Sequence, residues 1–138
     1  MMIEAPRIYP TFRFRDAAAM IEWLQKALGF TVHARYMDGA KVAHAELALG
    51  SSLIMCGDDR DDAYGQMAGK PCAQDGKSVY IAVDDAEAMF ARVQAAGAAI
   101  EQGLTDRDYG SREFICRDPE GNLWCIGTYW PKVPGQPD

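Results

Sequence analysis

Two side chains in one short run could perform acid–base chemistry. The run KVAHAELAL alternates apolar and polar residues, so His44 and Glu46, two positions apart, should lie on one face of a strand. An imidazole beside a carboxylate can act as a general base with its orienting partner, or the pair can begin a metal site. The simpler interpretation, which we prefer, is an exposed sheet face on which Glu46 forms an ion pair with Arg13.

The thiol of Cys125, in the stretch RDPEGNLWCIG, is a further candidate for chemistry. A nucleophilic cysteine needs a nearby cation to stabilise its thiolate, and no histidine lies near Cys125 in the sequence, so we interpret it as a small apolar side chain. Cys56, Cys72, Cys116 and Cys125 show no C-x-x-C spacing. We therefore expect four reduced thiols and no catalytic cysteine.

Composition limits the cellular locations and the classes of binding partner that we expect. The chain has 138 residues, of which 49% are hydrophobic and 25% charged, as in a globular protein that folds on its own. Its apolar runs are short, and the N-terminus MMIEAPRIYP lacks a signal pattern, so we expect no membrane partner and a cytoplasmic location. The net charge of −6 repels phosphate backbones, which argues against nucleic acid and mildly favours cationic ligands.

The first half of the chain predicts a strand, a helix and a three-strand meander. IYPTFRFRD alternates with Ile8, Phe12 and Phe14 on one face, and Asp16 is a good N-cap for a helix that ends at Gly29. Three further runs read as antiparallel strands separated by turns at Asp38-Gly39 and Gly50-Ser51: TVHARYM, KVAHAELAL and SLIMCGD.

The second half repeats this plan. SVYIAV predicts a strand, and Asp84 is expected to cap a helix, with Glu87 completing a capping box and Gly97 ending it. Asp84 follows Asp16 by 68 positions and Gly97 follows Gly29 by 68, which indicates an internal duplication. The predicted organisation is a first module, a linker, a second module and a tail, at 1–57, 58–76, 77–130 and 131–138.

Two βαβββ halves with DPEGN before the last strand resemble the vicinal oxygen chelate superfamily, which includes glyoxalase I, extradiol dioxygenases, and fosfomycin- and bleomycin-resistance proteins. The resemblance covers about residues 7–130 and is closest to the single-chain bleomycin-resistance and glyoxalase-like branch. Its most specific parts are FRFRDAAAMIEWLQKALGF, VDDAEAMFARVQAAG and RDYGSREFICRDPEGNLWCIGTY. It implies an α+β fold in which two tandem βαβββ modules form curled mixed sheets around a cleft.

The resemblance also implies four metal-ligand positions on the cleft faces, which fall on Tyr9, Met55, Ser78 and Cys125. Divalent metals in such sites are held by imidazole and carboxylate groups, whereas these residues offer a phenol, a thioether, a hydroxyl and a thiol. We therefore expect no cofactor, with a divalent metal as the disfavoured alternative.

Strand parity predicts which other side chains face the cleft. A two-residue turn at Gly50-Ser51 places Glu46 opposite Met55. A type I turn with a bulge at Gly121 places Ile115 opposite Cys125, whereas a plain two-residue turn would expose Phe114 instead. The expected ligand-binding residues are Tyr9, Thr11, Arg13, His44, Glu46, Met55, Ser78, Tyr80, Glu113, Ile115 and Cys125. Trp124, of opposite parity, is expected to pack under the second helix.

The resulting functional hypothesis is a metal-independent protein of the bleomycin-resistance type that sequesters a small organic molecule in its cleft. By analogy with the superfamily, it would be a homodimer. The alternative is a metal-dependent lyase, isomerase or dioxygenase whose metal site has shifted to His44 and Glu46. A third possibility is a domain that binds an ordinary metabolite and has no role in resistance.

Overall fold

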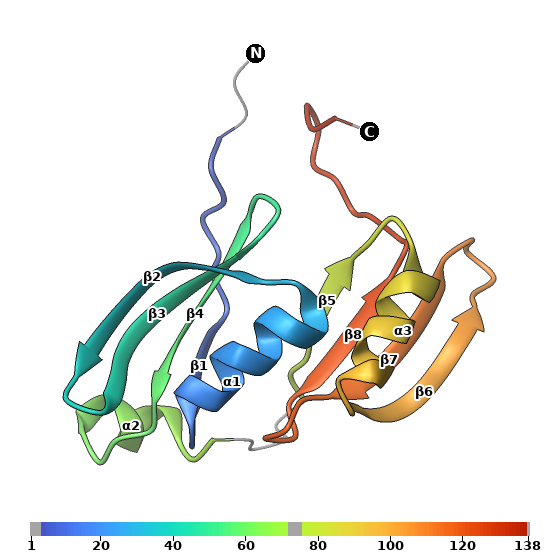
Figure 1. Cartoon of the computed structure of the whole chain (residues 1–138). Helices are drawn as coiled ribbons and strands as arrows, with labels where there is room; N and C mark the ends of the chain where they lie inside the picture. The colour runs from blue at the N-terminus through green and yellow to red at the C-terminus, as the bar shows by residue number, and fades with distance from the viewer. Residues whose placement is uncertain (1–3, 72–75, 138) are drawn as a thin grey trace.

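The computed structural model describes residues 4–71 and 76–137, which form two four-stranded sheets with helices (Figure 1). In spatial order the first sheet contains β1 (Thr11–Phe14), β4 (Ser52–Asp58), β3 (Lys41–Leu49) and β2 (Thr31–Asp38). The second contains β5 (Val79–Ala82), β8 (Leu123–Gly127), β7 (Arg112–Arg117) and β6 (Ala99–Asp106). In each sheet the first pair is parallel and the others are antiparallel, so the predicted α+β class with two like modules is confirmed.

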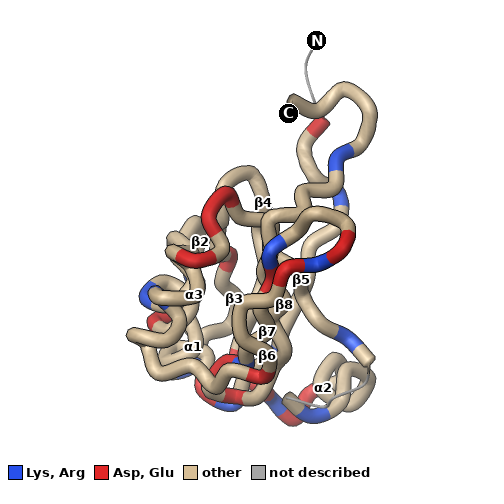
Figure 2. Tube along the Cα trace, turned by 90° about the vertical axis from the view of Figure 1, so that its right-hand side faces the viewer, with Lys and Arg blue, Asp and Glu red and all other residues tan. Residues whose placement is uncertain are grey.

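The helices divide between the two sides of the sheets. α1 (Ala17–Trp23) continues into a π-helical turn, η1 (Leu24–Leu28), and lies on the same side as α3 (Ala86–Ala95). Figure 2 shows α2 (Ala63–Ala68) on the opposite side of the strands. We call the sheet faces turned away from α1 and α3 the outer faces. α2 lies within the 58–76 stretch, which the sequence analysis assigned to a linker.

The helix ends explain a difference between the halves. The Asp16 carboxylate accepts a hydrogen bond from Ala19 N at 3.1 Å, as an N-cap should, but the second cap is Asp85, which accepts from Ala88 N at 3.0 Å. The prediction of Asp84 as the cap, and of its capping box, was wrong by one residue. The cap therefore precedes its left-handed glycine by 13 positions in the first half (Asp16 to Gly29) and by 12 in the second (Asp85 to Gly97). The wider turn of η1 accommodates the additional residue.

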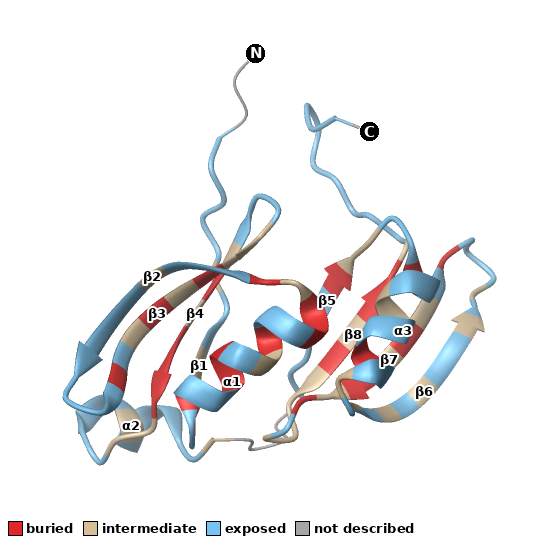
Figure 3. Cartoon of the chain, viewed as in Figure 1, coloured by how far each residue is buried: buried red, intermediate tan, exposed pale blue. Residues whose placement is uncertain are grey.

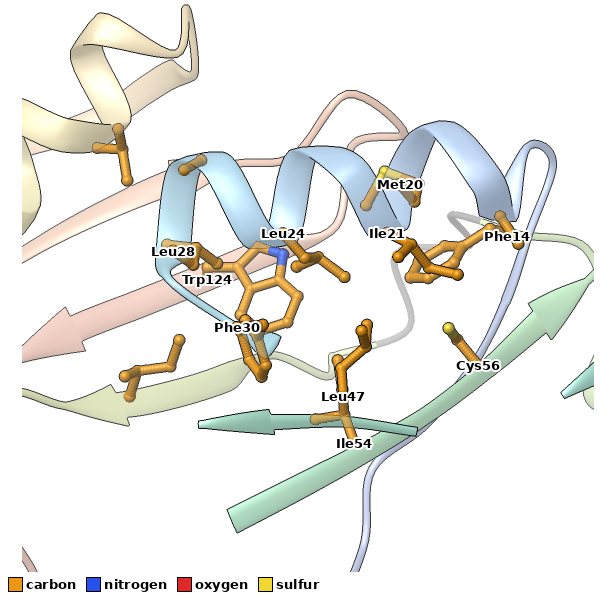
Figure 4. Packing of buried hydrophobic residues seen from close by; sticks show 14 of the residues in the cluster. Phe14, Met20, Ile21, Leu24, Leu28, Phe30, Leu47, Ile54, Cys56 and Trp124 are labelled. Carbon is orange, nitrogen blue, oxygen red and sulfur yellow. The ribbon is translucent and has the colours of Figure 1, made fainter. Parts of the chain in front are cut away.

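The core is continuous across both modules (Figure 3). Trp124 of β8 is fully buried, and its ring stacks on Phe12 of β1 with centroids 5.7 Å apart. It also meets Phe30 edge-on at 6.1 Å, and Figure 4 shows it beneath Leu24 and Leu28. Trp124 is thus a core residue as predicted, and it lies beneath the first helix.

Two polar contacts also join the modules. The Arg92 guanidinium of α3 donates to the backbone oxygens of Lys26 and Gln25, at 2.9 and 3.0 Å, and so satisfies carbonyls at the end of η1. The Glu120 carboxylate accepts from the backbone N–H groups of Arg15 and Asp16, at 2.7 and 2.9 Å. Both contacts join a side chain of the second module to the backbone at one end of the first helix.

Two details differ from the sequence prediction, and one predicted residue lies outside the described ranges. β1 begins at Thr11, and Ile8, expected on the core face, is 89% exposed. Asp38 pairs with Lys41, so the first hairpin turns at Gly39-Ala40 and not at Asp38-Gly39. Cys72 lies outside the described residues. None of the helices in the described ranges has the length and apolar character needed to cross a membrane.

Candidate binding cleft

The outer faces carry the side chains that strand parity predicted. Leu49 pairs with Ser52, which puts Glu46 opposite Met55. Asp118 N donates to Asn122 O at 3.0 Å across the second hairpin, and Gly121 has a φ of 90°, so the bulged turn is the one adopted. Ile115 accordingly lies opposite Cys125, and Phe114 is fully buried.

A cleft of about 990 Å³ opens where the free edge of β1 faces the start of β5. Four of the predicted ligand-binding residues line it: Thr11, Arg13, Ser78 and Tyr80. The other seven are not part of its lining: Tyr9, His44, Glu46, Met55, Glu113, Ile115 and Cys125. Its volume is at the upper end of the range typical for small-molecule pockets.

One wall of the cleft comes from the segment that the sequence had assigned to a linker. Asp62 caps α2 by accepting from Gly65 N at 2.7 Å, and the same carboxylate pairs with the Arg13 guanidinium at 3.2 Å. The hydrogen bond from Arg13 is the main cause that lowers the pKa of Asp62. Arg13 also lies over the Tyr64 ring, 4.7 Å from its centroid. Sequence reasoning missed Tyr64 because nothing in the periodicity predicted that this segment folds back over β1.

The superfamily's metal positions do not fit a metal ion in this chain. The Tyr9 hydroxyl donates a hydrogen bond to the backbone oxygen of Pro6, at 2.6 Å, and Tyr9 lies before β1. The residue beside Met55 is Thr11, and the residue beside Cys125 is Tyr80. The four positions themselves supply no imidazole and no carboxylate, although the carboxylate of Glu46 lies opposite Met55. Within the described ranges, no group of three or more His, Cys, Asp or Glu side chains is arranged to hold a metal.

His44 and Glu46 are close together, on the outer face of β3 beyond the cleft. His44 Nε2 lies 2.9 Å from Glu46 Oε2, and His33 Nε2 lies 3.9 Å from Glu46 Oε1. The expected ion pair between Glu46 and Arg13 is not formed, because Arg13 pairs with Asp62. The irregularity in β2 between Val32 and Ala34 could not be anticipated from the sequence, so His33 was missed.

The corresponding part of the second sheet holds a different polar group, centred on Glu113. Its carboxylate accepts from Tyr109 Oη at 2.8 Å and from Arg107 Nε at 3.1 Å. Burial alone would raise the pKa of Glu113, but hydrogen bonds from Tyr109, Ser111 and Arg107 outweigh it and lower that pKa. A Cβ at Gly127 would lie 2.5 Å from Glu113 Cγ and 2.8 Å from Tyr80 Oη, so the glycine is what lets these side chains approach.

The described cysteines are free thiols in two environments. Cys56 and Cys116 are buried on the helix-facing side, and desolvation is the main cause that raises their pKa values to about 12 and about 11. Such thiols are protonated at neutral pH and unreactive. Cys125 is half-buried on the outer face.

A second hollow, of about 490 Å³, lies at the other end of the boundary between the modules. Its lining is mainly apolar and includes Ile8, Leu53, Met89 and Trp130. Asp84 is the one charged residue among its described lining residues. This hollow therefore differs from the cleft in chemistry as well as in size.

Comparison with known proteins identifies the class. Residues 9–126 match the family model of the Glyoxalase/Bleomycin resistance protein/Dioxygenase superfamily. An uncharacterized protein of Mycobacterium bovis is 30% identical over 126 residues, which cover 88% of this chain and 82% of that protein. This chain belongs to the glyoxalase/bleomycin resistance protein/dioxygenase superfamily.

Solved structures agree with this assignment. TioX from Micromonospora sp. ML1 is similar with a TM-score of 0.73 and 27% identity, over 93% of this chain and 99% of that one. A glyoxalase/bleomycin resistance protein/dioxygenase family enzyme from Burkholderia phytofirmans PsJN has a TM-score of 0.66 at 22% identity, over 86% of this chain and 94% of that one. The second likeness is one of fold alone.

Proposed function

We propose that this protein binds and sequesters a small organic molecule in the cleft between β1 and β5 without the help of a metal ion. The observation that carries the proposal is a cleft of about 990 Å³ in a chain whose superfamily metal positions, Tyr9, Met55, Ser78 and Cys125, offer poor metal ligands. Aromatic rings and a few polar groups, such as Tyr64, Tyr80 and Ser78, line it, as in pockets for organic ligands. Where the ligand is a toxic natural product, sequestration would confer resistance.

A thermal-shift screen of chelator-treated protein tests this proposal. A panel of organic compounds, from small aromatic molecules to bleomycin, should contain at least one that raises the Tm, because a ligand that binds only the folded state stabilises it. Tyr64→Ala should abolish the shift, and Met67→Ala, in the same helix but 79% exposed and outside the cleft lining, should preserve it. Shifts that need added metal, or that survive Tyr64→Ala, would contradict the proposal.

The alternative is a metal-dependent lyase, isomerase or dioxygenase built on His44 and Glu46. The observation in its favour is that both histidines of the chain approach one carboxylate. Metal analysis of protein purified without chelator separates the two functions. Our proposal predicts less than stoichiometric metal, unchanged in His44→Ala. One zinc, nickel, manganese or iron per chain, lost in His44→Ala, would establish the alternative.

We further propose that the protein is a homodimer in the cytoplasm. Some large hydrophobic side chains of β2 are exposed in the single chain, among them Tyr36 at 61% and Met37 at 48%. A second copy of the chain would cover such a surface. The thiols of Cys56 and Cys116 suit a reducing compartment. Light scattering at micromolar concentration should give twice the chain mass of 15.2 kDa, and a monomer mass would refute the dimer.

A further inference from the structure

The described charged residues that line the cleft are opposite in sign to the net charge of the protein. The chain carries 20 acidic and 14 basic residues, which by itself would favour a cationic ligand. Yet the charged side chains among the described lining residues of the cleft are all basic: Arg13, Lys70, Lys77 and Arg117. The second hollow shows the contrast, because its described charged residue is Asp84.

The two arginines are oriented by acids that are not part of the lining. Arg13 is paired with Asp62, and Arg117 Nε donates to Glu101 at 2.8 Å. In both pairs the arginine side chain is less exposed than its partner, at 18% against 43% for Arg13 and 25% against 48% for Arg117. A guanidinium has five N–H donors, so each arginine keeps donors for a ligand after pairing with one carboxylate.

Aromatic surface lies beside these cations. Tyr64 has one face toward Arg13 and remains 45% exposed, and Tyr80 is 37% exposed across the cleft. Phe12, half-buried at the floor, extends the apolar surface to the core through its stacking on Trp124. A planar ring can therefore stack in the cleft while an acidic substituent meets the basic side chains.

We infer that the ligand of this cleft is a small aromatic anion, a planar ring system bearing a carboxylate, sulfonate or phosphate group. This inference rests on the proposed function and specifies its ligand class. Basic and aromatic side chains together give the cleft its selectivity. The rings supply apolar contact area, and the basic side chains make the affinity for an anion higher than that for its uncharged or cationic analogues.

Two fluorescent probes with nearly the same ring framework test the inference: 1-anilinonaphthalene-8-sulfonate, which is anionic, and N-phenyl-1-naphthylamine, which is neutral. Each is titrated into chelator-treated full-length protein and three variants. Lys70→Gln removes a cleft cation in the exposed segment after α2. Lys41→Gln removes an equal charge at an exposed position of β3 outside the cleft, and Tyr64→Ala removes aromatic surface.

The inference predicts one sulfonate site per chain, bound about tenfold more tightly than the neutral probe. Lys70→Gln should weaken sulfonate binding about three- to tenfold and leave the neutral probe unchanged, and Lys41→Gln should affect neither. Equal affinity for both probes, weakened by Tyr64→Ala but not by Lys70→Gln, would overturn the inference and leave the proposed function standing. Binding that neither Tyr64→Ala nor Lys70→Gln weakens, or no binding of either probe, would overturn both.

Discussion

The two sheets share one strand order and one pattern of parallel and antiparallel pairing, yet their outer faces carry different chemistry. Met55 and Cys125 occupy equivalent places, each beside the first strand of its sheet. Opposite them lie Glu46 in the first sheet and Ile115 in the second. The face that packs on the helices is apolar in both sheets and forms one core, so the scaffold is specified there and the outer faces are free to diverge.

The helices show a second asymmetry, which concerns how the modules are joined. The first helix ends in a π-helical turn whose backbone carbonyls accept hydrogen bonds from Arg92. Within residues 4–71 and 76–137, no side chain of the first module makes the corresponding contact at the end of α3. π-helical turns in proteins are single-residue insertions into an α-helix and commonly occur where a special contact is needed. Here that contact is between modules, and it places the joint on the helix side, opposite the cleft.

Removing the Trp124 ring should cause the largest loss of stability, because this side chain belongs to one sheet and packs against Phe12 and Phe30 of the other module. Trp124→Ala should lower the free energy of unfolding by about 3–5 kcal/mol, because a large buried ring is replaced by a cavity. Trp130→Ala, at a side chain that is 50% exposed, should cost less than about 1 kcal/mol. Urea unfolding of both variants checks this. A Trp124→Ala loss below that of Trp130→Ala would show that the modules do not share a core.

The next comparison is between two buried carboxylates at different ends of the sheets: Asp58 is the last residue of β4, and Asp118 lies in the turn between β7 and β8. Asp58 accepts from Ala17 N at 2.9 Å and Val42 N at 2.6 Å, and Asp118 accepts from Trp124 Nε1 at 3.0 Å and from three donors of its own turn. Asp58→Asn and Asp118→Asn should each lower the unfolding free energy by about 2 kcal/mol, because an amide N–H₂ then faces a buried donor. Asp108→Asn, in an exposed loop, is the matched control. If all three variants unfold alike, these carboxylates do not organise the sheet ends.

The joint at η1 should give a smaller effect. Arg92→Gln loses two hydrogen bonds to the first module and should lower the unfolding free energy by about 1–2 kcal/mol. Lys26→Gln changes an exposed side chain on the same turn and should be neutral within about 0.5 kcal/mol. Equal stability of the two variants in chemical denaturation would contradict a role for Arg92 in joining the modules.

The smallest effect concerns pH and the polar group of the second sheet. The folded state lowers the pKa of Glu113 below its ordinary 4.5, so its charged form stabilises the fold above that pH, and this contribution is lost as the pH falls through the lower, folded-state pKa. Glu113→Gln should thus lose less stability than wild type on acidification from pH 6 to pH 3, by about 1 kcal/mol or less. Denaturation curves at both pH values provide the test. If Glu113→Gln lost more unfolding free energy than wild type between pH 6 and pH 3, the predicted direction would be wrong.

Local patterns predicted the scaffold well because they depend on neighbours in sequence. The Asp16 cap, the left-handed Gly29 and the register at Gly121 each follow from short-range chemistry, and the structure has all three. The Asp84 prediction failed because Asp85 is an equally good cap and only the length of the helix decides between them.

The candidate site was predicted less well, because it depends on segments that meet in space. Thr11, Arg13, Ser78 and Tyr80 were found by strand parity, and they do line the cleft. Tyr64 and Lys70 come from a segment whose path over β1 is set by the pairing of Arg13 with Asp62, 49 positions away in sequence. The net charge of the chain likewise pointed to a cationic ligand, because a sum over all residues does not show which charges gather in the cleft.

The most direct test of the central claim is a titration of chelator-treated wild type and Tyr64→Ala with 1-anilinonaphthalene-8-sulfonate, followed by fluorescence. The account predicts one site per chain in metal-free wild type and about tenfold weaker binding in the variant. Binding that appears only after a divalent metal is added, or that is the same in both proteins, would contradict it.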